Sequence, residues 1–250
     1  MRNGRQRGLY NVMSLPPGAI ELLAGAVGYA LSVCALVTPG ELSLPTPCAE
    51  WDLAMLLAHL GASMADLETV ISTGRLDLEP PPDHRADDPV ELVRDRAAGL
   101  LCAVYGYAGP ERFVTVGGLP LPAGLVACTG AVEIAVHGWD VSAARGRAGR
   151  SGSVPGSSAT PIPAALATRM LGLCPLLVAG REGLFALPVK VPPQASPGDR
   201  LVGYLGRQPR LLASNMSGAT FLTAGGPRAP HRPRHRLRGR GPHPVRQGRA

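Results

Sequence analysis

Residues 130–146, GAVEIAVHGWDVSAARG, place Glu133 and His137 four positions apart in an apolar run with no other charge before Asp140. The apolar spacing predicts a helix, and a four-residue step returns to the same helix face. A carboxylate and an imidazole would then lie side by side, where a buried and unpaired carboxylate is costly. Three interpretations are open: a Glu–His hydrogen bond filling a core gap, two polar groups at the edge of a buried stripe, or two metal ligands.

Outward from this helix, which we expect to start at Pro122, the sequence predicts an all-α protein built on a four-helix bundle. The other helices are expected over about residues 17–37, from an N-cap at Asp52, over about 89–107 and over about 163–179. Pro39 and Gly40 would stop the first of them. Strand content should be slight, because only RFVTVGGLPLPAG, residues 112–124, suggests a short β-ribbon or an extended loop.

His59, in the second predicted helix, is the candidate for a third metal ligand. It lies on the same predicted helix face as Leu56, Leu60 and Ser63. A lone histidine on an apolar face is more often a satisfied core residue. If the second and fourth helices face one another, however, His59 meets Glu133 and His137. Two imidazoles and one carboxylate with an open position are typical of catalytic zinc, although Ni, Co and Fe(II) also accept this set.

The chain carries a formal charge of +7, but this charge is unevenly distributed. Residues 211–250 hold eight arginines and no acidic residue, which leaves residues 1–210 with a net charge of −1. This segment is dense in Pro, Gly and Arg and has no aromatic residue after Phe221, so we expect a disordered tail. The alternative is weak electrostatic binding of nucleic acid or an anionic surface by the tail.

The cysteines exclude two classes of small domain. The five cysteines are Cys34, Cys48, Cys102, Cys128 and Cys174. They are widely spaced and never form a C-x-x-C motif, which argues against a disulfide scaffold and against a zinc ribbon. We expect Cys48, which precedes a helix, to have a structural role rather than to act as the nucleophile.

No membrane span is expected in the first predicted helix. The apolar run Leu22 to Val37 is shorter than the about 20 residues a span needs, so a buried bundle helix is favoured. Near the central pair, Trp139 is expected to pack in the bundle. Asp140 is either an acceptor that orients a ligand or a carboxylate on the helix surface.

Two motifs carry a resemblance to a known family. LPTPCAEWDLAMLLAHL, residues 44–60, and EIAVHGWDVSAARG, residues 133–146, resemble the paired signatures of the mycothiol-dependent maleylpyruvate isomerase N-terminal family, within the DinB-like metal-binding superfamily. The similarity extends more loosely from about Leu15 to Arg210. The resemblance implies a DinB-like four-helix bundle that holds a divalent metal, commonly zinc, through His59, Glu133 and His137.

The same resemblance implies a function, with mycothiol as a cofactor. We expect a metal-dependent isomerase or thiol transferase of the cytoplasm, whose partners are a low-molecular-weight thiol and a small electrophilic substrate. The alternative is a non-catalytic metal-binding bundle that acts as a sensor or interaction module. A metal-binding domain over residues 14–210 and a tail over 211–250 are predicted, and no substrate-binding arginine of a second domain is carried over from the family.

Deletion of residues 211–250 should leave the folded domain intact, because every predicted amphipathic segment precedes Arg210. The midpoint of thermal unfolding and the metal content should match those of the full chain. A truncated protein that is insoluble, or that loses its metal, would show that the tail belongs to the fold.

Overall fold

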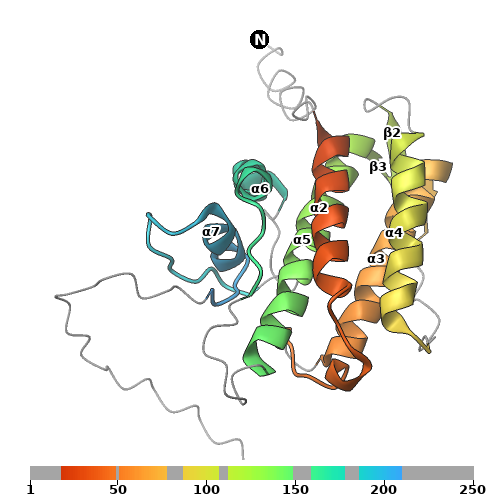
Figure 1. The fold of residues 1–250 in the computed structure, drawn as a ribbon. Coiled ribbons are helices and arrows are strands. Elements are labelled where there is room, and N and C mark those ends of the chain that lie inside the picture. Colours follow the sequence, from red (N-terminus) through yellow and green to blue (C-terminus); the bar gives the residue numbers. More distant parts are fainter. Residues whose placement is uncertain are drawn as a thin grey trace, which may run out of the picture. The chain divides into compact units, whose positions relative to one another are not determined.

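The protein is described by a computed structural model that covers residues 18–48, 51–77, 87–106, 112–148, 159–177 and 186–209. Four helices form the bundle: α2 (Ala19–Cys34), α3 (Leu53–Thr73), α4 (Pro89–Tyr105) and α5 (Ala123–Ala148). Helix α2 packs along α5, and α3 packs along α4 and also contacts α5 (Figure 1). The predicted all-α bundle is confirmed. The predicted tail over residues 211–250 lies outside the described residues.

The helix boundaries follow from local capping chemistry. The carboxylate of Asp52 accepts a hydrogen bond from the Met55 amide at 2.8 Å, which satisfies a free donor at the start of α3. Asp88 caps α4 in the same way, with Pro89 at the first helical position. Gly74, with φ of 79°, ends α3 in a left-handed conformation that favours glycine.

The core of the bundle is apolar and tightly packed. The large side chains with the least exposure include Leu22 and Leu23 of α2, Leu56, Leu57 and Leu60 of α3, and Ile134 of α5. At the α2–α5 contact, a Cβ placed on Gly138 would lie 3.2 Å from the Cα of Ala30. The absence of a side chain at Gly138 therefore permits the two helices to approach closely.

Helix α3 is the one helix, among those described, with the length and apolar composition to cross a membrane. Its apolar face includes Leu53, Met64 and Val70, which are buried inside the bundle. Core helices of soluble proteins meet the same criterion. The apolar run that begins at Leu22 forms α2, a buried bundle helix as predicted.

The described residues also form a small three-stranded sheet. Strands β2 (Phe113–Val116) and β3 (Leu119–Pro122) form the expected ribbon, with Gly117 and Gly118 at positive φ in its turn. The two-residue strand β1 (Arg75–Leu76) pairs parallel to β2 and was not predicted. Helix α5 begins at Ala123, directly after β3.

Two more helices follow the bundle. Helix α6 (Ala164–Leu177) was predicted, whereas α7 (Pro197–Tyr204) was not. The start of α7 has ordinary signals, because the Ser196 hydroxyl accepts from the Asp199 amide and Pro197 begins the helix. Helix α7 packs on α6 and buries Leu201 and Val202, and Leu205 directly after the helix is buried too.

Two glycines should respond oppositely to substitution. Gly28 lies in α2 with nothing within 4 Å of an added Cβ, so Gly28→Ala should stabilise the protein by about 0.5–1 kcal/mol through helix propensity. Gly138→Val should destabilise it by about 1–3 kcal/mol, because it overpacks the α2–α5 contact. Urea unfolding of both variants measures this difference. Equal effects of the two substitutions would contradict the close approach.

Candidate functional site

The three predicted ligand residues meet between α3 and α5. His59 Nε2 lies 3.3 Å from Glu133 Oε1, and the ring centroids of His59 and His137 are 4.9 Å apart in an edge-on arrangement. One ligand atom from each of the three residues lies within 4.8 Å of the other two. The structure thus brings together His59, Glu133 and His137 across 78 positions of sequence, from His59 to His137.

The donor set fits a divalent cation. Metal–ligand bonds of about 2.0–2.1 Å at tetrahedral angles separate neighbouring ligand atoms by about 3.3–3.4 Å. The His59 to Glu133 separation of 3.3 Å matches this spacing, and the ligand atoms of all three residues lie within 4.8 Å of one another. Two neutral imidazoles and one carboxylate supply a single negative charge and leave further coordination positions open.

Glu133 is neither fully buried nor unpaired, which corrects the premise drawn from its apolar sequence context. Its side chain is 37 % exposed, and that of His59 is 35 % exposed, whereas His137 is 13 % exposed. The Ser63 hydroxyl donates to Glu133 Oε1 at 2.9 Å. Burial raises the pKa of Glu133, but hydrogen bonds from His59 and Ser63 outweigh it and hold the pKa below its ordinary value.

Asp140 is fully buried, so the interpretation of a helix-surface carboxylate is wrong. Its Oδ2 lies 3.2 Å from His137 Nδ1, and the Cys48 thiol donates to the same oxygen at 3.3 Å. Arg207 donates from Nη2 to Oδ2 at 2.8 Å and from Nε to Oδ1 at 3.3 Å. Burial raises the pKa of Asp140, but the hydrogen bonds from His137 and Arg207 bring it below its ordinary value.

A second group of potential ligands shares His137 with the first. Cys48, His137 and Asp140 also lie close enough to hold a metal. The guanidinium of Arg207, however, already neutralises Asp140 at 2.8 Å and lies 3.8 Å from Cys48 Sγ. A metal cation there would be repelled by this buried positive charge, so the set of His59, Glu133 and His137 is the better candidate.

Trp51 covers the two histidines and was not assigned a role from the sequence. Its ring centroid lies 4.8 Å from that of His59 and 6.3 Å from that of His137. Trp51 immediately precedes Asp52, the residue that caps α3, and the capped helix start therefore places the indole against the site. The indole thus forms an apolar wall beside the two imidazoles.

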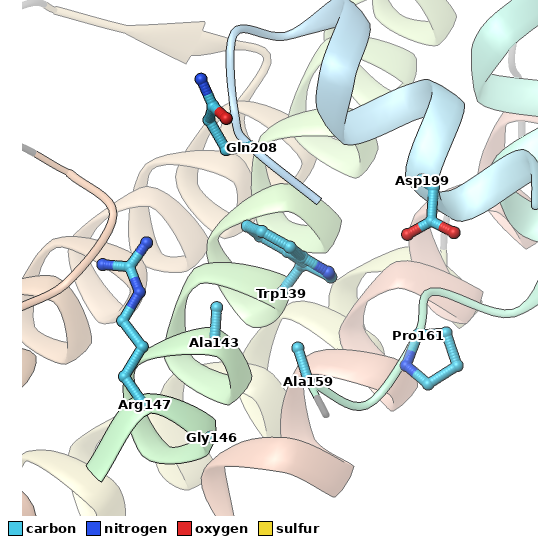
Figure 2. A pocket seen from close by; sticks show the side chains of 8 residues that line it. All are labelled: Trp139, Ala143, Gly146, Arg147, Ala159, Pro161, Asp199 and Gln208. Atoms are coloured by element: carbon cyan, nitrogen blue, oxygen red, sulfur yellow. The ribbon is translucent and has the colours of Figure 1, made fainter. Parts of the chain in front are cut away.

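A small pocket lies elsewhere on α5, and His59, Glu133 and His137 do not line it (Figure 2). It is lined by Trp139, Ala143, Gly146, Arg147, Ala159, Pro161, Asp199 and Gln208. Trp139 is 5 % exposed, in agreement with its predicted packing role. The pocket is therefore distinct from the cluster of His59, Glu133 and His137.

The comparisons with known proteins give one match. The family model of the mycothiol maleylpyruvate isomerase N-terminal domain matches residues 24–142. No curated protein and no solved structure matches the chain. The matched range contains the three candidate ligands and Asp140, whereas Arg207 lies beyond it.

Cys48 should be a poor nucleophile. Burial, with the charge of Asp140 as a second cause, raises the pKa of its thiol to about 12, so little thiolate exists at pH 8. In iodoacetamide labelling followed by mass spectrometry, the exposed Cys102 should react well before Cys48. Labelling of Cys48 should accelerate as the pH rises toward 12. Equal labelling rates at pH 8 would contradict the assignment.

Proposed function

We propose, from the match of residues 24–142 to the family model of the mycothiol maleylpyruvate isomerase N-terminal domain, that the protein is a divalent-metal-dependent, thiol-using enzyme. The proposed activity is that of an isomerase or thiol transferase acting on a small electrophilic substrate, with mycothiol as the thiol. The observation that carries the proposal is the convergence of His59, Glu133 and His137 from α3 and α5.

In this proposal His59, Glu133 and His137 hold the cation, with Zn²⁺ as the first candidate. A bound divalent cation would stabilise the thiolate form of a coordinated thiol at neutral pH. The carboxylate of Glu133 would supply the one negative charge of the ligand set. Ser63 holds that carboxylate in place through its hydrogen bond at 2.9 Å.

The exposure of the side chains suggests the direction of approach for a thiol and its substrate. His59 and Glu133 are each more than one-third exposed, whereas His137 is mostly covered and is held from behind by Asp140. Access would therefore be from the side of His59 and Glu133. Trp51 would exclude water from the imidazoles on another side of the site.

We place the protein in the cytoplasm. Cys34, Cys48, Cys102 and Cys128 form no disulfide in the part of the chain that the structure describes, which fits a reducing compartment. A cytosolic low-molecular-weight thiol and a small electrophile are the partners that follow from the proposed activity.

Substitution of each ligand should remove the metal. Elemental analysis should find one divalent cation per full-length chain. His59→Ala, Glu133→Ala and His137→Ala should each weaken cation binding. Loss of a residue that only hydrogen-bonds to a metal ligand lowers metal affinity about 10–100-fold, and loss of a ligand itself should lower it further. His84→Ala, at a residue outside the described ones, and the exposed Glu91→Ala serve as matched controls and should retain the metal.

The cobalt-loaded protein can be used to test whether a thiol binds to the metal. Its visible absorption should change when mycothiol or a surrogate thiol is added, because an open coordination position accepts sulfur. Full metal content in all three ligand variants would overturn the assignment of the site. Loss of metal without any spectral response to thiol would keep the site and favour the non-catalytic sensor or interaction module.

A further inference from the structure

Arg207 reaches the candidate site from a segment outside the bundle. It follows α7, and its side chain is 12 % exposed. The guanidinium bonds both carboxylate oxygens of Asp140, and Asp140 Oδ2 in turn lies 3.2 Å from His137 Nδ1. A chain of direct contacts therefore links residue 207 to an imidazole that we assign to the metal.

The backbone around Arg207 is built to present this side chain. The Arg207 amide donates to Val202 O at 2.9 Å, and its Nη1 donates to Leu205 O at 3.1 Å. Gly206 has φ of 83°, and a Cβ there would lie 2.7 Å from the carbonyl oxygen of Ala186. The turn after α7 thus requires glycine, because Gly206 has a positive φ and lies close to the backbone of Ala186.

We propose that Arg207 is a positioning residue, which clamps Asp140 against His137 and so makes cation affinity depend on the docking of residues 186–209. The proposal rests on the metal site proposed above. A planar guanidinium that engages both oxygens fixes the orientation of a carboxylate, which a single point charge does not do. A fixed carboxylate in turn fixes the ring of a metal-binding histidine.

Two opposing effects of Arg207 must be separated. Its positive charge repels a cation, whereas its geometry orders His137 to receive one. Asp140 lies between Arg207 and His137 and neutralises the guanidinium, so the pair presents its negative end to the imidazole. We therefore expect the ordering to dominate, and linkage then requires that a bound cation also stabilise the docked segment.

The substitution Arg207→Lys separates the effect of geometry from that of charge. Lysine keeps the positive charge but cannot bond both carboxylate oxygens of Asp140 as the planar guanidinium does. Zn²⁺ affinity of the full chain, measured by competition with a chelating dye, should fall about 10–100-fold. Arg200→Lys, at an exposed position of α7, is the matched control and should bind as the wild type does. In an Asp140→Asn background Arg207→Lys should add little further loss, since both act through one contact.

A glycine variant tests the same coupling without changing any charge, and it serves if Arg207→Lys fails to fold. Gly206→Ala places a Cβ against the backbone of Ala186 and displaces the turn that carries Arg207, so Zn²⁺ affinity should again fall. Gly172→Ala in α6, where nothing lies within 4 Å of the added Cβ, should not change it. Hydrogen exchange gives a readout independent of activity: Zn²⁺ should slow exchange in residues 201–205 of the wild type and not in Arg207→Lys.

The outcomes distinguish the two proposals. If the wild type binds no Zn²⁺, the ligand assignment is wrong and the coupling is wrong with it. If the wild type binds Zn²⁺ but Arg207→Lys and Gly206→Ala bind it equally well, the metal site stands and the role of Arg207 is overturned. Additive losses from Arg207→Lys and Asp140→Asn would likewise overturn the proposed route through Asp140.

Discussion

The fully buried carboxylate of Asp140 is the constraint around which the site is arranged. A charged group that is shielded from solvent must be compensated by partners inside the protein. Removal of one partner from a buried ion pair typically costs about 3–5 kcal/mol of stability. That is a large fraction of the about 5–15 kcal/mol by which a domain is stable. Asp140 meets this constraint by contacting residues 92 and 67 positions away, Cys48 before α3 and Arg207 after α7. One carboxylate thereby ties two distant parts of the chain to α5.

His137 connects this electrostatic centre to the candidate metal centre. One side of its ring faces Asp140, and the ring also meets that of His59 edge-on. The positive charge of Arg207 lies in the group that contains Cys48, whereas Glu133 contacts His59 and the Ser63 hydroxyl. The two groups are therefore divided by charge, one around a guanidinium and the other suited to a divalent metal ion.

Local patterns predicted much of this arrangement, and long-range contacts could not be predicted in the same way. The cap at Asp52, the apolar spacing of α3 and the four-residue step from Glu133 to His137 each depend on a few neighbouring residues. Helix α7 has only eight residues, too few to show a periodic pattern, although Ser196 and Pro197 marked its start. Nothing in the spacing of Arg207 indicates that it pairs with Asp140, because that contact depends on how α7 packs. The burial of Asp140 has the same origin.

The prolines of β3 have a consequence for how the protein behaves at high concentration. Strand β3 lies at the edge of the sheet, and the hairpin carries two exposed apolar side chains, Leu119 in β3 and Phe113 in β2. An open strand of this kind can recruit a strand from another molecule and start aggregation. Pro120 and Pro122 lie two positions apart, so both would direct their backbone nitrogens toward the same, unpaired side of the strand. Proline carries no N–H, and the outer edge therefore lacks the donors that an incoming strand would need.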